Sequence, residues 1–170
     1  MQHERALVAS AFPDDTGEAA PRTRELQIDF TANPTIDNYL AVIEALCGDR
    51  VLVPVVATAT ELGRTRGGLS SDKEAEMSVV GIQASDGRRA LLAFTGIDSL
   101  ELWDARARPV PVTLDIAAEA TLSDGAAALV IDVAGPDPVV VDGEMLAELA
   151  AGHRLVRLDN GFGWAVSTAE

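Results

Sequence analysis

The chain has 170 residues, of which 48% are apolar, and its 13 Lys and Arg residues against 27 Asp and Glu residues give a formal net charge of −14. This length suits one domain with a short additional segment. Binding to nucleic acid and to anionic lipid depends on cationic contacts, so the acidic balance argues against a nucleic-acid or membrane partner. A salt-tolerant or high-GC source would give a similar composition, so the charge alone identifies no partner.

The chain contains a single cysteine, Cys47, which excludes an intramolecular disulfide and a cysteine metal cluster. No apolar run reaches the ~20 residues that a membrane-spanning helix needs. The first residues lack the basic segment and apolar core of a secretory signal. We therefore expect a cytoplasmic protein, with neither a cofactor nor a metal.

The N-terminal part is interpreted as a flexible acidic leader over residues 1–34, followed by one globular domain over residues 35–170. Residues 11–24 are rich in Pro, Asp, Glu and Gly, a composition typical of segments that do not pack. Between Leu26 and Phe30 apolar and polar residues alternate, which favours a short edge strand at the end of the leader.

A helix and a strand open the expected domain. Apolar residues at helical spacing predict a helix from Ile36 to Leu46, with Thr35 or Asp37 as its N-cap. Residues 50–57 read RVLVPVVA and predict a strand. Pro54 lies inside it and cannot donate a ladder hydrogen bond, so the proline indicates an edge position or a bulge.

The middle of the chain reads as a loop followed by a hairpin. Residues 58–73 are rich in Gly and Ser among charges, which predicts a mobile loop. Two apolar runs, residues 79–82 and 89–94, are joined by Asp86-Gly87, a pair that favours a tight hairpin turn. Residues 90–94 of the second run are all apolar, so we expect this strand to be covered on both faces of the sheet.

A short helix carrying Trp103 follows this hairpin. Ile97, Leu100 and Trp103 are spaced by three and share one side of a helix, which Thr95 or Asp98 can cap. Two prolines then end the helix, because proline cannot donate a backbone hydrogen bond and disfavours helix in the residue before it.

The remaining sequence predicts helices alternating with strands and hairpins. The expected elements are a helix over residues 112–123, strands over 127–133 and 138–141, a helix capped by Asp142, and a hairpin of 155–158 with 163–166 across Asn160-Gly161. Hairpins exclude an all-parallel sheet. The expected class is therefore α+β, or mixed α/β, with helices packed on a largely antiparallel or mixed sheet.

Four sequence blocks together resemble a known family. They are Leu91–Thr95, Leu102-Trp103, Arg108–Val112 and Ala126–Pro136. In order and spacing they resemble the SseB N-terminal domain family, particularly its actinobacterial members, over roughly residues 35–150. The resemblance implies an α+β fold and a bacterial cytoplasmic setting. It supplies no catalytic residues.

Three residues carry chemistry that catalysis could use, and each also has a structural interpretation. His153 follows a predicted helix, where an imidazolium would interact with the exposed carbonyls. Cys47 ends an apolar helix, where burial as a small hydrophobe is the common fate. Asp132 lies in a buried-looking strand; it may point outward, pair with an arginine, or take part in a reaction.

The candidate binding residues are Trp103, Arg106 and Arg108. Trp and Arg are the types that dominate interface hot spots, although Trp103 could instead close the core with its helix neighbours. We therefore expect a non-enzymatic protein-interaction or regulatory domain, which binds a protein partner or a second copy of itself. An exposed edge of the strand over residues 50–57 is a second way to bind a protein.

Two further functions remain open from the sequence. The chain could be a small-molecule-binding protein or an enzyme, with a pocket where Arg108, Asp132 and His153 converge. It could also be an acidic, chaperone-like protein for basic clients, whose binding would fade as salt is added.

Overall fold

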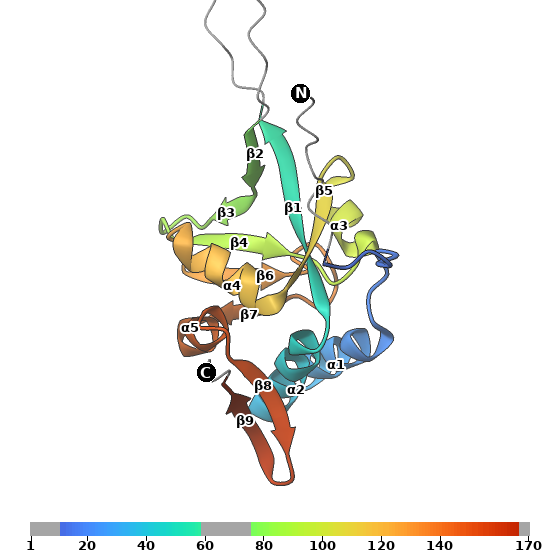
Figure 1. Cartoon of the computed structure of the whole chain (residues 1–170), viewed down its shortest axis with the longest axis vertical. Helices are drawn as coiled ribbons and strands as arrows, with labels where there is room; N and C mark the ends of the chain where they lie inside the picture. Colours follow the sequence, from blue (N-terminus) through green and yellow to red (C-terminus); the bar gives the residue numbers. More distant parts are fainter. Residues whose placement is uncertain (1–10, 59–75, 167–170) are drawn as a thin grey trace, which may run out of the picture.

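The computed structural model describes residues 11–58 and 76–166. Figure 1 shows helices packed around two connected sheets, with a separate two-stranded hairpin at one end. The elements are α1 (Pro21–Ala32), α2 (Ile36–Cys47), β1 (Arg50–Thr58), β2 (Glu76–Val79), β3 (Gly81–Gln83), β4 (Arg89–Ala93), α3 (Ile97–Asp104), β5 (Arg108–Thr113), α4 (Leu114–Ser123), β6 (Ala128–Ile131), β7 (Val139–Asp142), α5 (Gly143–Ala150), β8 (Arg154–Leu158) and β9 (Gly161–Ala165).

The sheets are mainly antiparallel. One has the order β2-β1-β5, the second has the order β3-β4-β6-β7, and β8 pairs only with β9. Strands β4 and β6 are parallel, and the other strand pairs are antiparallel. Leu52 of β1 and Phe94 after β4 exchange two backbone hydrogen bonds, of 2.7 and 2.9 Å, which join the first two sheets. The predicted α+β class with a mixed sheet is therefore confirmed.

The proline in β1 is accommodated inside a sheet. β1 lies between β2 and β5, so the expected edge position is wrong. Because Leu52 directs its backbone groups toward Phe94, strand alternation directs those of Pro54 to the same side. On that side β1 changes neighbours: the pairing with β2 begins only at Val55, opposite Val79. The missing N–H of Pro54 therefore lies where no regular ladder bond is required.

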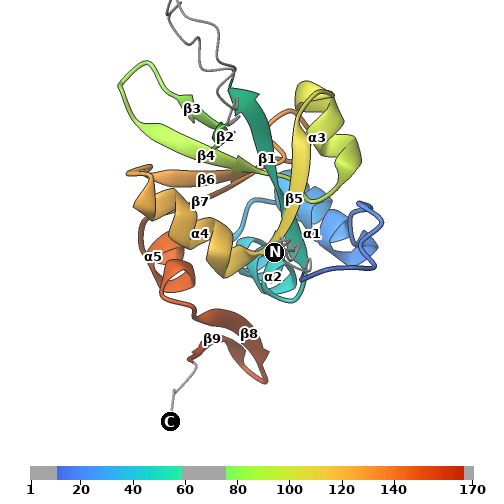
Figure 2. The same cartoon turned by 45° about the horizontal axis from the view of Figure 1, so that its top comes forward.

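Two clusters of buried apolar side chains form the core, one on each side of β4. The larger cluster includes Ile43, Leu91, Leu129 and Leu146 and is covered by α2, α4 and α5. The smaller contains Leu52, Leu92, Phe94, Leu100 and Ala107. Adjacent residues of β4 thus enter different clusters, which confirms that this strand is covered on both faces. Figure 2 shows α3 and α4 on opposite sides of β1 and β5.

Helix α1 replaces the edge strand that was expected between Leu26 and Phe30, so that prediction is wrong. Pro21 begins the helix, where its missing N–H and fixed φ cost little. Thr23 and Gln27, four positions apart, are 2% and 1% exposed. The buried face of α1 is therefore partly polar. The alternation of apolar and polar residues in this segment does not reflect a strand. Phe30 packs on α2, with its ring centroid 5.6 Å from that of Tyr39.

Local signals located most other elements. Thr35 caps α2 by accepting a hydrogen bond from the Asn38 N–H at 3.2 Å, and Gly87 takes a positive φ of 88° in the β3–β4 turn. The helix expected from residue 112 begins at Leu114, because the chain through Thr113 pairs with β1 as β5. The loop predicted at 58–73 lies almost wholly outside the described residues.

The edge of β7 gives the first test. The Tyr39 hydroxyl donates to the Val140 carbonyl at 2.9 Å, and burial together with the charge of Asp142 raises the pKa of Tyr39 to about 12. Tyr39 is the only tyrosine in the chain. We predict a phenol titration midpoint near 12 in the ultraviolet absorbance, while circular dichroism confirms that the chain stays folded. Tyr39→Phe should lower the free energy of unfolding by about 1 kcal/mol. A midpoint near 10 in the folded chain would contradict the burial of this phenol beside Asp142.

Candidate functional site

Asp132 is the most deeply buried carboxylate in the described part of the chain. It directly follows β6 and is 3% exposed. Its φ of 55° is the only positive value among the described residues other than glycine. Asp tolerates this left-handed conformation better than most residues do. The conformation closes a turn in which the Gly135 N–H donates to the Asp132 carbonyl at 2.9 Å.

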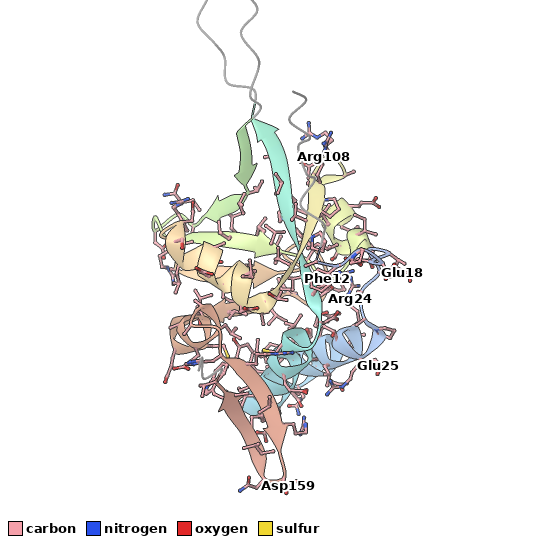
Figure 3. All side chains as sticks on the ribbon, in the orientation of Figure 1. Phe12, Glu18, Arg24, Glu25, Arg108 and Asp159 are labelled. Atoms are coloured by element: carbon pink, nitrogen blue, oxygen red, sulfur yellow. The ribbon has the colours of Figure 1, made fainter. Side chains whose placement is uncertain are left out.

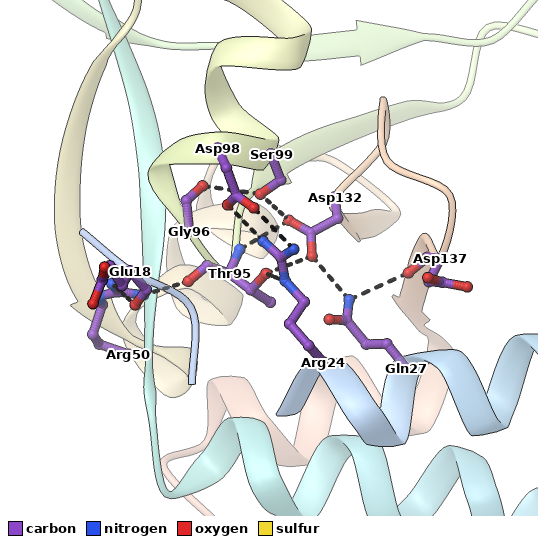
Figure 4. A network of polar contacts seen from close by, with 10 residues as sticks. All are labelled: Glu18, Arg24, Gln27, Arg50, Thr95, Gly96, Asp98, Ser99, Asp132 and Asp137. Atoms are coloured by element: carbon purple, nitrogen blue, oxygen red, sulfur yellow. Dashed lines mark hydrogen bonds and ion pairs between the residues drawn. The ribbon is translucent and has the colours of Figure 1, made fainter. Parts of the chain in front are cut away.

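Four hydrogen bonds reach the Asp132 carboxylate, from three parts of the fold (Figure 4). Thr95 donates its N–H to Oδ1 at 2.9 Å and its hydroxyl to Oδ2 at 2.7 Å. Ser99 of α3 donates its hydroxyl to Oδ1 at 2.6 Å. Gln27 of α1 donates from Nε2 to Oδ2 at 2.9 Å. The carboxylate therefore joins the ends of β4 and β6 to α3 and to α1.

Arg24 extends this network to the surface. Its Nε donates to the Thr95 hydroxyl oxygen at 2.7 Å, which leaves the Thr95 proton for Asp132. The two Nη atoms of Arg24 donate to the two carboxylate oxygens of Asp98, at 2.7 and 3.1 Å. Hydrogen bonding to Arg24 lowers the pKa of Asp98. The bidentate pair fixes α1 against the first turn of α3.

Arg50 holds the other side of Thr95. This residue is 6% exposed, and its Nη1 donates to the Thr95 carbonyl at 2.5 Å. Its Nε and Nη2 donate to the carboxylate of Asp15 at 2.6 and 2.9 Å, and Nη2 also donates to the Glu18 carbonyl at 2.8 Å. The hydrogen bond from Arg50 lowers the pKa of Asp15. Residues 15–18 are therefore fastened over the start of β1.

The network corrects the expected cap of α3. The N-cap of α3 is Gly96, which has no side chain to accept a capping hydrogen bond. An expected cap, Thr95, instead directs its hydroxyl to Asp132. A cavity of about 40 Å³ lies beside the network, between α1, α3 and the turn after β6. The Oε1 atom of Gln27 is buried and has no hydrogen-bond partner among the described residues. All four hydrogen bonds to Asp132 come from within the fold, so its carboxylate links α1 and α3 to the sheet.

The three residues expected to converge in one pocket are separated. Asp132 borders the 40 Å³ cavity, whereas His153 lines a different cavity, of about 420 Å³. His153 follows α5, and its Nδ1 lies 2.6 Å from a carboxylate oxygen of Glu148. Arg108 begins the edge strand β5 and is exposed (Figure 3). The hypothesis of one small-molecule pocket formed by Arg108, Asp132 and His153 is therefore wrong.

The three candidate binding residues lie close together in the chain but differ in exposure. Trp103 is half-buried against the smaller core cluster, with its ring centroid 5.7 Å from that of Phe94. The Arg106 side chain is 91% exposed and pairs with Asp104 at 3.2 Å. Leu102, which precedes Trp103 in the chain, is 68% exposed and borders the 40 Å³ cavity. The turn from α3 to β5 thus combines an anchored tryptophan with an exposed leucine and exposed arginines.

The free edge of β5 is poor in donors. Since Leu52 directs its backbone groups away from β5, the residues of β1 on either side of it direct theirs toward β5. In β5 the residues opposite these, such as Val110, direct their backbone groups toward β1. The backbone groups of Pro109 and Pro111 are therefore directed outward. Prolines offer carbonyl acceptors but no N–H. An added strand would lack donors at both positions, which disfavours strand addition here.

One of three comparisons with known proteins gives a match. The fold is an α+β domain with a mixed sheet. The family model of the SseB protein N-terminal domain matches residues 28–148, more than half of the chain. The chain therefore belongs to the SseB N-terminal domain family. No curated protein and no solved structure gives a significant match.

The described residues contain neither a membrane-spanning helix nor a group of metal ligands. Across residues 11–58 and 76–166, no helix has the length and apolar character to cross a membrane. Within the same residues, no three His, Cys, Asp or Glu side chains are grouped as metal ligands would be.

Sequence reasoning singled out Asp132 but missed the residues that bind it. Its partners Gln27, Thr95 and Ser99 are 105, 37 and 33 positions away in the chain. One signal was present: an aspartate that directly follows an apolar strand requires donors if it is buried. The identity of those donors depends on the tertiary fold.

Replacing Asp132 tests the network. Asp132→Asn places an amide donor against the donors of Thr95 or Gln27, and should lower the free energy of unfolding by about 3 kcal/mol, as measured by urea denaturation. Asp124→Asn, at an exposed ion pair with Arg89, is the matched control and should change little. Equal effects of the two variants would refute the structural role of Asp132.

The Asp15–Arg50 pair predicts a dependence on acid. Because the folded chain lowers the pKa of Asp15, the stability from this carboxylate is fully present above its ordinary pKa of 3.8. It is lost progressively as the pH falls from there through the lowered pKa of the folded chain. Asp15→Asn should therefore destabilise the chain by about 2 kcal/mol at pH 7 and by less at about pH 3. Urea denaturation at both pH values measures the difference. If Asp15→Asn lowered the free energy of unfolding equally at the two pH values, the ion pair would be contradicted.

Proposed function

We propose that this chain is a non-enzymatic domain that binds a protein partner through the α3 surface, defined here as Leu102, Trp103, Arg106 and Arg108. The observation that carries the proposal is the 68% exposure of Leu102, which precedes the anchored Trp103 in α3. A large exposed aliphatic side chain next to a tryptophan and arginines has the composition of an interface hot spot.

The edges of β5 and β7 favour docking by side chains. β1 is a central strand, which removes the strand-addition mode expected for residues 50–57. The outward edge of β5 carries two prolines, and a partner strand would find no donor there. On β7, the Tyr39 hydroxyl already occupies the outward carbonyl of Val140. A partner at α3 therefore relies on the side chains of the α3 surface.

The residues with reactive groups have environments that support a non-enzymatic role. Burial raises the pKa of the Cys47 thiol, which disfavours the thiolate that a nucleophile requires. The Asp132 carboxylate is engaged by four hydrogen bonds within the fold. His153, which follows α5, interacts with Glu148 in the last turn of that helix, a contact that suits a helix end.

Comparative affinity capture tests the proposal. The purified chain is immobilised and exposed to a lysate of its source organism, and bound proteins are quantified for wild type, Leu102→Asp and Leu122→Asp. Leu122 lies on α4 and is 45% exposed, so it is a matched control. We predict a stoichiometric partner whose recovery falls at least about tenfold with Leu102→Asp, since a charge in an interface core costs more than 1.4 kcal/mol. Leu122→Asp should leave it unchanged.

Two outcomes would overturn the proposal. A partner that binds both variants equally would show that it docks elsewhere. A chain that captures no partner, and that is monomeric by light scattering at high concentration, would contradict a protein-binding role. Leu102 is preferred to Trp103 as the mutated residue, because removing Trp103 also removes its core contact with Phe94.

A further inference from the structure

A second region of the fold, separate from the α3 surface, has the form of a small-molecule site. A cavity of about 420 Å³ lies where the end of α2, the start of α4 and the start of β8 meet. This volume is within the range of ligand sites. Phe12, Leu114, Leu149 and Cys47 supply its apolar wall. The residues that fasten the N-terminal segment, Asp15 and Arg50, lie on the neighbouring side of Phe12.

The polar groups of this cavity differ in their remaining hydrogen-bonding capacity. Asp49 is engaged, because its Oδ1 accepts the Arg50 N–H at 2.9 Å and its Oδ2 accepts the Thr23 hydroxyl at 3.3 Å. The guanidinium of Arg50 is occupied by Asp15 and by two carbonyls. These residues shape the wall but have little left to offer a ligand.

Arg154 is the cation with free capacity. Its Nη2 donates to the Cys47 carbonyl at 2.6 Å, which places the guanidinium at the mouth of the cavity. A guanidinium has five N–H donors in a planar fork, and the remaining donors of Arg154 have no partner among the described residues. The fork matches the two oxygens of a carboxylate.

The start of α4 adds to this preference. Thr113, the N-cap, makes no side-chain cap hydrogen bond, and Thr113 and Leu114 both line the cavity. The first-turn N–H groups of a ten-residue helix carry the positive end of its dipole. Asp115 opposes the binding of an anion, because this residue also lines the cavity and its carboxylate forms no hydrogen bond with the described residues.

We propose that this cavity binds a small organic carboxylate with an apolar body. The carboxylate pairs with the free edge of Arg154 near the start of α4, and the apolar body lies against Phe12 and Cys47. Asp115 limits the affinity by repulsion. This assignment is independent of the protein-binding role of the α3 surface, and no residue is shared between the two.

The single cysteine provides a direct reporter. Cys47 lines the cavity and is the only thiol in the chain, so a bound ligand should shield it from neutral iodoacetamide. The probe is 3-phenylpropionate, and its uncharged amide and inorganic phosphate are the comparisons. We predict that 3-phenylpropionate slows alkylation in a saturable way. The amide and phosphate should shield Cys47 at least about tenfold more weakly, since each lacks one of the two recognised parts.

Two charge variants with opposite expected effects complete the test. Arg154→Gln should weaken protection by 3-phenylpropionate about tenfold, because it removes a charge-assisted hydrogen bond. Asp115→Asn should strengthen it about threefold, because it removes a like charge. Both residues lie at the surface of the cavity, and unchanged thermal melting verifies that the variants fold.

Three results would overturn the proposal. Equal shielding by the carboxylate and its amide would show that charge is not recognised. Equal shielding by phosphate would show that any anion suffices. An absence of saturable shielding by 3-phenylpropionate would show that the cavity does not bind this class of ligand.

Discussion

The arrangement of this domain depends on the burial of one carboxylate. Asp132 is almost inaccessible to solvent, and an uncompensated charge there would be very costly. Its four hydrogen bonds come from the end of β4, from α3 and from α1, so the charge is satisfied only when all three are in place. The network therefore favours this arrangement of the elements over others, in addition to stabilising it. Thr95 is its centre, since it also contacts Arg24 and Arg50.

The same network supports both regions for which a binding function is proposed. Ser99 and Asp98 fix the first turn of α3, and the α3 surface is carried at the other end of this short helix. On the opposite side, Arg50 links Thr95 to the segment that includes Asp15, which adjoins the wall of the 420 Å³ cavity. The α3 surface and the cavity are thus separate sites that share one internal support.

The sequence predicted those elements that are determined by local chemistry. Thr35 marks the start of α2, and Asp86-Gly87 and Asn160-Gly161 mark two hairpins. These signals act over a few residues, so a single sequence contains them fully. The α+β class followed from them, as did the buried strand β4.

The remaining features depend on partners distant in the chain. α1 was missed because it buries Thr23 and Gln27, and a polar buried face has no hydrophobic period. β5 was missed because its prolines resemble helix terminators, although prolines are tolerated where the backbone points away from the neighbouring strand. Asp132 was placed in a buried-looking strand with its direction left open, and its donors could not be identified without the tertiary fold. The separation of Arg108, Asp132 and His153 was likewise invisible in one sequence.

Hydrogen exchange tests the central claim most directly. Amide exchange is compared by mass spectrometry between wild type and Asp132→Asn, under conditions in which both are folded. If the carboxylate joins α1 and α3 to the sheet, exchange should rise in both helices together, while β8, β9 and α5 remain as protected as in wild type. Unchanged exchange in α1 and α3, or an equal rise throughout the chain, would contradict the account.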